Sequence, residues 1–344
     1  MLAVFRSGGK LNFSQIHRSM KRDHDYWRDF TGGKSKCCVS RIQLRRILKD
    51  TDIEGLKAVT EATFGANETI DPQARQWFSI DGKELRGSID KSSGDKRGES
   101  VVLVTAQEDK TSKVVGYYSG TKDSERGVVD EYFETQSDLS GTAYTMDALH
   151  NNSGLLEGIH GKRGVYLSQI KGNQKILRED LGDMERRSDC LNYKKTVEKG
   201  HGRIETRIYR IYLVETGCLE RRWSNTGMSC FIRVDRTRKV VKTGKTSSET
   251  SYYVSNINTG LIDQYNLPNA VRGHWSVEAN NNMRDTNFGE DGLRSLVSGI
   301  QQSVSCILTA VMNILIQRNA GENMNEMREE IVADINSIHQ YFNR

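Results

Sequence analysis

The chain has 344 residues, of which 36% are hydrophobic and 28% are charged, and its formal net charge is +5. This length predicts two or three domains, and this composition excludes a fibrous or largely disordered chain. The six cysteines are irregularly spaced, no signal-peptide pattern is present, and polar residues interrupt the most apolar run, residues 303–316. These features predict a cytoplasmic protein with reduced thiols and no membrane span.

Residues 11–65 are predicted to be helical, because Leu44, Ile47 and Leu48 follow helical spacing and Ser40 is a candidate N-cap. The polar side of that helix carries three arginines, which are Arg41, Arg45 and Arg46. This side can lie on DNA or simply face water, and water is the commoner outcome.

Strands are predicted from Trp77 onward, where short apolar runs replace the helical spacing. The predicted order is β-β-β-α-β-α-β, over residues 77–80, 100–106, 113–118, 124–139, 142–146, 155–160 and 165–170. The first three strands fit an antiparallel meander, and the continuous apolar run of the second is typical of a strand covered on both faces.

The second half of the chain interrupts this pattern with a basic block rich in β structure. A helix is predicted over 175–187, strands over 204–214, 228–234 and 251–254, and helices over 268–283, 292–318 and 322–342. These elements separate the first α/β segment from a mainly helical C-terminal part.

The net charge alternates along the chain. Residues 1–65 and 171–250 carry +6 and +8, whereas residues 66–170 and 251–344 carry −5 and −4. Basic segments attract phosphate backbones, and clustered carboxylates repel them unless metal ions neutralise the charge. The alternation fits a metal-dependent protein that acts on nucleic acid, and ordinary surface charge is an equal alternative.

Two aspartates directly follow predicted strands: Asp81 follows the first and Asp147 follows the fourth. These strands can be neighbours in a mixed sheet, which would bring both carboxylates to one edge. Glu278, on the helix after the β-rich block, can supply a third oxygen ligand, and Asp285, seven residues on, is the second candidate. Three such acids suit two magnesium or manganese ions, although a lone aspartate after a strand is more often a turn residue or a helix cap.

Five ordered blocks of the sequence contain these acids or lie between them: SIDGKELRGS, TMDALHNN, YLSQIKGNQKIL, GHGRIETRIYRI and VRGHWSVEANNNMRDTNFGEDGLR. Together they resemble the DDE transposases of bacterial insertion sequences, and in particular the H-repeat-associated branch. The resemblance runs over residues 71–319, and CCVSRIQLRRIL within residues 11–65 resembles the N-terminal region of the same branch.

This resemblance implies an α/β fold with a ribonuclease H-like mixed sheet, in which Asp81, Asp147 and Glu278 are the catalytic acids and hold two Mg²⁺ or Mn²⁺ ions. It implies cleavage of double-stranded DNA at element ends, joining of the freed 3′-hydroxyl to target DNA, and a nucleoid-associated homodimer. The implied domains are a helical DNA-binding region (1–65), a catalytic core in two parts (71–184 and 261–319), a β-rich basic insertion (185–260) and a C-terminal helix (320–344).

Some positions depart from related transposases, which place arginine four residues before the third acid and lysine seven residues after it. Here these positions hold His274 and Asp285, and Arg272 and Arg284 are candidates for the phosphate contacts. The segment 1–5 resembles the inside of a helix, which predicts a shortened copy. Because the three acids are intact, we expect an active enzyme, and a hydrolysis-only nuclease and an inactive DNA-binding remnant are the alternatives.

Nine residues are predicted to contact DNA: Lys171, Asn173, Gln174, Arg203, Arg207, Arg236, Arg238, Lys242 and Arg272. The first three form a polar turn, and the arginines at 203 and 207 can instead pair with Glu205 in a surface ladder. The densest basic stretch, residues 233–245, predicts a DNA-facing hairpin. Trp223 can stack on an unpaired base but is more often a core residue, and Trp275 is predicted to pack in the core.

Two other kinds of site are rejected. The sequence TGKT at residues 243–246 lacks the first glycine of a P-loop, because residue 239 is lysine, and a strand rather than a helix is predicted to follow. The cysteines form no C-x-x-C pair, so reduced thiols are expected rather than a zinc site.

Overall fold

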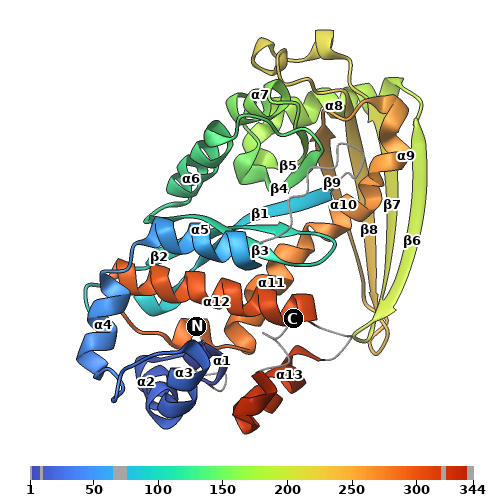
Figure 1. Ribbon diagram of the computed structural model, residues 1–344. Coiled ribbons are helices and arrows are strands. Elements are labelled where there is room, and N and C mark those ends of the chain that lie inside the picture. The colour runs from blue at the N-terminus through green and yellow to red at the C-terminus, as the bar shows by residue number, and fades with distance from the viewer. Residues whose placement is uncertain (1, 8–10, 65–75, 319–322, 339–344) are drawn as a thin grey trace. The chain divides into compact units, whose positions relative to one another are not determined.

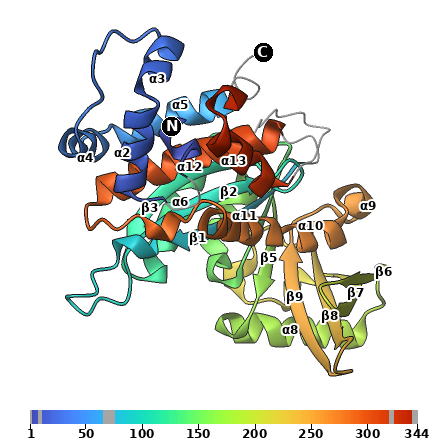
Figure 2. The same cartoon turned by 90° about the horizontal axis from the view of Figure 1, so that it is seen from below.

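The structure is a computed structural model that describes residues 2–7, 11–64, 76–318 and 323–338 (Figures 1 and 2). The chain divides into two compact units. The first contains residues 1–68, 81–128 and 276–344, and the second contains residues 69–80 and 129–275. Each unit is therefore assembled from segments that are distant in the sequence.

Within the described residues, nine strands form a mixed sheet in the order β3-β2-β1-β4-β5-β9-β8-β7-β6. The strands are β1 (Gln76–Glu84), β2 (Glu99–Ala106), β3 (Ser112–Ser119), β4 (Thr142–Met146), β5 (Val165–Ile170), β6 (Asn192–Gly200), β7 (Arg203–Leu213), β8 (Cys230–Val240) and β9 (Thr246–Ser255). Residues 76–80 of β1 belong to the second unit, and residues 81–84 belong to the first. The predicted α/β class is confirmed, as is the absence of a helix after TGKT, where β9 follows.

The first unit contains the antiparallel pair β2 and β3 and most of the helices. These are α1 (Leu2–Phe5), α2 (Phe13–Arg22), α3 (His24–Thr31), α4 (Arg41–Lys49), α5 (Ile53–Phe64), the start of α6 (Lys122–Thr135), most of α11 (Trp275–Thr286), α12 (Ser298–Arg318) and α13 (Met324–Ala333). Ser40 caps α4 as predicted, because the Gln43 N–H donates to its hydroxyl oxygen at 3.2 Å. Ile47 was predicted on the apolar face but is 54% exposed, whereas Leu44 and Leu48 are buried.

Helix α12 forms the centre of the first unit, where it packs against α4, α5 and β3 (Figure 1). The sequence predicted no segment that could cross a membrane, but α12 is long and apolar enough to do so. In the structure, 78% of its most apolar window is buried inside the protein. The polar residues of this helix bond within the core. The Asn313 side chain bonds to both backbone groups of Ser112 at 2.7 and 2.8 Å, and the Ser303 hydroxyl donates to the Leu48 carbonyl oxygen at 2.8 Å.

In the second unit, β1, β4 and β5 run parallel, and the antiparallel strands β9, β8, β7 and β6 extend this sheet from β5. Its helices are the end of α6, α7 (Ser153–Gly161), α8 (Lys175–Arg187), α9 (Ile262–Tyr265) and α10 (Leu267–Gly273). The predicted order β-β-β-α-β-α-β is confirmed. The first and fourth strands are parallel neighbours, which the carboxylate argument requires.

Three predicted helices differ from the structure. The tail predicted over 322–342 contains, within the described residues, α13 (Met324–Ala333) and a 3₁₀ turn (Ile335–Ile338). The stretch 268–283 is divided into α10 and α11 at His274, after Gly273, a residue type that weakens a helix. The helix predicted over 292–318 begins only at Ser298, because a 3₁₀ turn and an irregular segment come first. The division at His274 affects the candidate site, because it sets the start of the helix that carries Glu278.

Candidate active site

Asp147 lies in the second unit, directly after β4. One of its carboxylate oxygens accepts a hydrogen bond from the Leu149 N–H at 2.8 Å, which caps the 3₁₀ turn Ala148–His150. The helix-cap role that the sequence allowed for Asp147 is therefore present. Asp147 is half-buried, and in the described part of the chain no other hydrogen bond or ion pair of its side chain is seen, so the second oxygen can accept a ligand.

The turn that carries this aspartate is held by residues that follow β5. The Asn173 amide donates to the Ala148 carbonyl oxygen at 2.7 Å. The Gln174 amide donates to the Asn151 carbonyl oxygen, also at 2.7 Å. Lys171 is exposed in the same segment. Two of the three polar residues predicted here therefore position the turn, and their contact with DNA stays a prediction.

A row of polar side chains lies two residues before the acids. Ser79 on β1 and Thr145 on β4 face each other in register, and their hydroxyl oxygens are 2.9 Å apart. Nδ1 of His274 lies 3.0 Å from the Thr145 hydroxyl. Burial lowers the pKa of His274 to about 4, against the opposing effect of Asp147, so the imidazole is neutral near pH 7. This row was not predicted, although the sequence carries a signal for it, which is a hydroxyl residue two positions before each aspartate.

Asp81 lies within β1 and not directly after it as predicted, because the strand continues to Glu84. It belongs to the first unit, together with α11 from residue 276 onward. The Asn281 amide donates to Oδ2 of Asp81 at 3.3 Å. Glu278 comes three residues before Asn281, so the two side chains share one face of the helix. Glu278 is exposed, and its side chain makes no hydrogen bond or ion pair with the other described residues. The first unit thus places Asp81 beside the helix face that carries Glu278, through a contact that the sequence did not indicate.

Another carboxylate, Glu125, lies beside the residue that follows Asp81. Glu125 is 3% exposed and accepts a hydrogen bond from the Tyr118 hydroxyl at 2.8 Å. A Cβ atom at Gly82 would lie 2.5–2.9 Å from the carboxyl atoms of Glu125, so glycine permits this close approach. Burial, and then the charge of Glu125, raises the pKa of Tyr118, which keeps the phenol protonated as a donor.

Asp285, the second candidate for the third acid, is paired with Lys83 of β1. Nζ of Lys83 lies 2.8 Å from a carboxylate oxygen of Asp285, and 3.4 Å and 3.6 Å from those of Glu290 and Asp291. Burial raises the pKa of Asp285, the Lys83 ammonium opposes this rise, and Asp291 adds to it. Because Asp285 already has a buried cation as partner, Glu278 is the better candidate for binding a metal ion.

Arg284 cannot make the phosphate contact that the sequence suggested. Its guanidinium donates to the two carboxylate oxygens of Glu290 at 2.6 and 2.9 Å, and its side chain is 1% exposed. The hydroxyls of Ser305 and Thr309 on α12 accept further hydrogen bonds from it, each at 2.8 Å. The expectation is wrong because α12 and Glu290 enclose the guanidinium inside the first unit.

The donor atoms of the predicted metal site are of the right kind. Asp81, Asp147 and Glu278 supply only carboxylate oxygens, the ligands that magnesium and manganese prefer. Among the described residues, no three His, Cys, Asp or Glu side chains converge closely enough to hold a metal ion. Asp81 and Glu278 belong to the first unit and Asp147 to the second, so the metal site stays a prediction.

The arginines of the β-rich block form a ladder of ion pairs in the second unit. Arg207 pairs with Glu198 at 3.2 Å and also with Glu205. Arg236 pairs with Glu205 at 3.0 Å and with Glu249 at 2.8 Å. Burial raises the pKa of Glu205, but the hydrogen bond and charge of Arg236 and the charge of Arg207 bring it below its usual value. The pairing of Arg207 with Glu205 that the sequence left open as an alternative is therefore formed, and the second arginine of the ladder is Arg236 and not Arg203.

The other basic residues that were predicted to contact DNA differ in whether an acidic side chain pairs with them. Arg238 lies 3.6 Å from Glu205, and Arg272 pairs with Glu198 at 3.2 Å. Lys242 is exposed in the turn between β8 and β9, and Arg203 is half-buried at the start of β7. DNA binding by these residues stays a prediction, and it would use side chains that mostly have acidic partners.

The two tryptophans of this region occupy different environments. Trp223 is 1% exposed, which confirms the core placement that the sequence favoured. Trp275 was predicted to pack in the core but is 45% exposed. The guanidinium groups of Arg236 and Arg272 lie 5.4 Å and 5.8 Å from the centre of its ring. These cation–π contacts explain how a large aromatic side chain is kept at the surface.

No protein-family model matches the chain. The chain is 28% identical to "Putative transposase YncI" of Escherichia coli O157:H7 over 69% of its length, and 27% identical to "Putative protein YbfL" of Escherichia coli K12 over 67%. It is 30% identical to "H repeat-associated putative transposase YbfD" of Escherichia coli K12 over 38% of its length and 53% of that protein. Two of these relatives are named as putative transposases, and one of the two is named as H repeat-associated.

This homology confirms the resemblance that the sequence blocks indicated. The matched part covers 61% of the length of the first of these relatives and 64% of the second. The chain therefore spans less than two thirds of each of these two relatives.

Proposed function

We propose that this chain is a DDE transposase with a ribonuclease H-like core, which cleaves DNA at the ends of an insertion element and joins the freed 3′-hydroxyl to target DNA. Its homology to proteins named as transposases supports this function. The observation that carries the proposal is the parallel pairing of β1 with β4, in which Ser79 lies opposite Thr145. Asp81 and Asp147 each follow these partners by two residues, Asp81 within β1 and Asp147 directly after β4.

Asp81, Asp147 and Glu278 are the proposed ligands of two Mg²⁺ or Mn²⁺ ions. When bound, the ions would stabilise the attacking and leaving oxygens of an in-line displacement at phosphorus. The chain itself orients the carboxylates: the Leu149 N–H holds Asp147, and the Asn281 amide holds Asp81. Glu278 is exposed on the Asn281 face of α11, where its side chain can turn onto a bound ion.

Double-stranded DNA is the proposed partner, both as element end and as target. The net charge of +8 over residues 171–250 supports this, because cations drive binding to the phosphate backbone. A homodimer is proposed, because two element ends must be held together, and the protein would act at the nucleoid.

The test is an assay with labelled duplex DNA that carries the flanking element end, with and without Mg²⁺ or Mn²⁺. A transposase is expected to nick the DNA at the element end only with metal, and to join the freed end to a second duplex. Nicking without joining would replace the proposal with a hydrolysis-only nuclease. Binding without metal-dependent nicking would identify a DNA-binding remnant.

Replacing Asp285 with asparagine is expected to reduce the cleavage rate by less than about tenfold, because this carboxylate is engaged with Lys83 and not with a metal ion. Glu278→Gln, the comparison variant on the same helix, should reduce the rate by about 10²-fold or more. Single-turnover cleavage at saturating metal distinguishes the two. A larger loss in Asp285→Asn than in Glu278→Gln would transfer the role of third acid to Asp285.

A further inference from the structure

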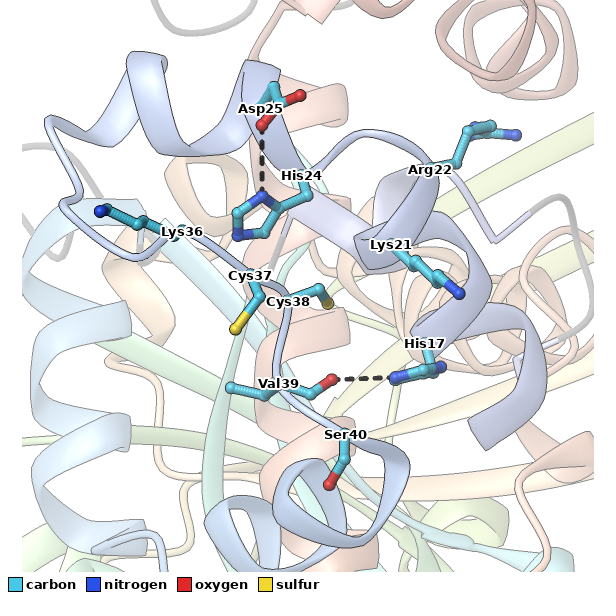
Figure 3. Close-up of a pocket in the computed structure, with 10 residues that line it drawn as sticks. All are labelled: His17, Lys21, Arg22, His24, Asp25, Lys36, Cys37, Cys38, Val39 and Ser40. Atoms are coloured by element: carbon cyan, nitrogen blue, oxygen red, sulfur yellow. Dashed lines mark hydrogen bonds and ion pairs between the residues drawn. The ribbon is translucent and has the colours of Figure 1, made fainter.

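A polar cavity of about 490 Å³ lies in the first unit, lined by α2, the start of α3 and residues 36–40 (Figure 3). Small-molecule sites of this size are mostly lined by apolar and aromatic side chains. Here the wall is mainly polar and basic, and it includes Lys21, Arg22 and Lys36. This lining favours a charged, polar ligand over an apolar cofactor.

One hydrogen bond fixes the shape of the cavity. Nε2 of His17 donates to the Val39 carbonyl oxygen at 2.9 Å, which ties residues 36–40 to α2. Lys21 lies one turn after His17, on the same face of α2. Figure 3 shows Lys21 and Lys36 on opposite sides of the Cys37–Cys38 segment. The two lysines therefore lie on opposite sides of the cavity wall, one on helix α2 and one on a segment that is bonded to it, and in this view their ammonium ends point away from each other.

The charge of the cavity wall is positive. Lys21 and Lys36 are exposed and form no ion pair with other residues in the described ranges. Arg22 is paired with Asp23 at 2.8 Å, and Asp25, a carboxylate of the wall, is paired with Arg28 at 2.9 Å. The two lysines are thus the cations of the wall whose charge is not balanced by a neighbour.

The thiols of the wall do not change this charge. Burial, and then the neighbouring Cys37, raises the pKa of Cys38, while Lys21 opposes the rise, so the Cys38 thiol is neutral near pH 7. The histidines and cysteines of the wall form no group of three that could hold a metal ion in the described structure. An anion is therefore the ligand class that the cavity fits.

The surroundings of the cavity favour a polyanion over a small free anion. Residues 13–49 contain ten basic and three acidic side chains, a net charge of +7. Arg18 on α2 and Arg41 and Arg45 on α4 are exposed in the same helices. A segment with this net charge and two unbalanced lysines matches the repeated charge of a nucleic-acid backbone.

We propose that Lys21 and Lys36 each bind a backbone phosphate of DNA at this cavity. The proposal rests on the proposed function and adds to it a specific anchoring site in the N-terminal helices. Phosphate contacts of this kind fix the register of a protein on a duplex without reading its sequence.

The first experiment compares duplex binding by the full chain, by Lys21→Gln/Lys36→Gln and by Lys34→Gln/Lys49→Gln. The control pair removes two exposed lysines from the same region outside the cavity wall. Fluorescence anisotropy is measured over a series of salt concentrations. The cavity variant should lower the slope of log K against log salt by about 2, because two phosphate contacts are lost, and the control should change it much less. Equal changes in both variants would overturn the proposal.

The second experiment uses the exposed Cys37 as a reporter. Iodoacetamide labelling of this residue is followed by peptide mass spectrometry, with DNA or with inorganic phosphate at matched ionic strength. We expect duplex DNA to slow the labelling of Cys37 in the native protein and not in Lys21→Gln/Lys36→Gln. Equal protection by inorganic phosphate would show a site for the free anion, and no protection by bound DNA would also reject the proposal.

These results are separable from those that test the proposed function. If the native chain fails to bind any duplex, the proposed function fails together with this site. If it cleaves DNA while the cavity variant and its control bind with equal salt slopes, only the cavity proposal fails.

Discussion

Replacing Asp147 with asparagine is expected to reduce metal-dependent DNA cleavage by at least about 10³-fold, because several kcal/mol of transition-state stabilisation depend on the bound ions. Asparagine keeps an oxygen that can accept the hydrogen bond from the Leu149 N–H, so the cap of the turn is retained. Only the negative charge is lost. The expected result is therefore a folded protein that binds DNA with normal affinity and does not cleave it.

Two further variants separate charge from structure at this position. Asp147→Ala removes both the charge and the cap, and it should also lose about 1 kcal/mol of stability. Asp138→Asn is the matched control, because Asp138 accepts a hydrogen bond from the Ser140 N–H at 3.0 Å in a surface turn of the same unit. Asp138→Asn should cleave at the native rate. If Asp147→Asn cleaved DNA at the native rate, Asp147 would not be a ligand in the proposed metal site.

Replacing Arg284 with methionine is expected to destabilise the first unit by about 3–5 kcal/mol, because it leaves the carboxylate of Glu290 buried without its main partner. The two side chains are 1% and 2% exposed. The hydroxyls of Ser305 and Thr309 would lose the guanidinium as well. Lys83, at 3.4 Å from Glu290, remains as a partial partner and should keep the loss toward the lower end of this range.

Urea unfolding followed by circular dichroism measures this loss of stability. Arg86→Met is the control, because Arg86 is 71% exposed and lies 3.8 Å from Asp291, so it should cost no more than about 1 kcal/mol. The double variant Arg284→Met/Glu290→Met removes both charges and should be less destabilised than the sum of its single variants. If Arg284→Met lost less stability than Arg86→Met, the proposed contribution of the Arg284–Glu290 pair to the core would be contradicted.

Hydrogen bonds in the core of the first unit explain why the apolar helix α12 contains polar residues. From composition, Asn313 and Ser303 interrupt the apolar run of α12 and reduce its resemblance to a membrane span. In the first unit, Asn313 binds both backbone groups of Ser112, and Ser303 binds a carbonyl oxygen of α4. Buried polar groups are tolerated when they are hydrogen-bonded, and these partners are between 200 and 260 residues away in the sequence.

Most of the local structure could be predicted from the sequence, and the sequence also nominated Asp81 and Asp147 as candidate acids. Apolar runs of strand length predicted β4 and β5 at their observed bounds and placed Asp147 directly after β4. The prediction that Asp81 directly follows its strand is wrong, because β1 continues through Asp81 to Glu84. The order of the elements also allowed β1 and β4 to be neighbours in the sheet, and the structure shows them paired. These features could be predicted because backbone periodicity and strand ends depend on nearby residues.

The contacts of the charged and aromatic side chains depend on the tertiary structure. Asp285 and Glu278 lie on the same helix, but the buried Lys83, some 200 residues earlier, pairs with Asp285 and not with Glu278. The exposure of Trp275 depends on arginines from α10 and β8. Burial and ion pairing arise from segments that meet only in the folded chain, so no local pattern in the sequence could predict them.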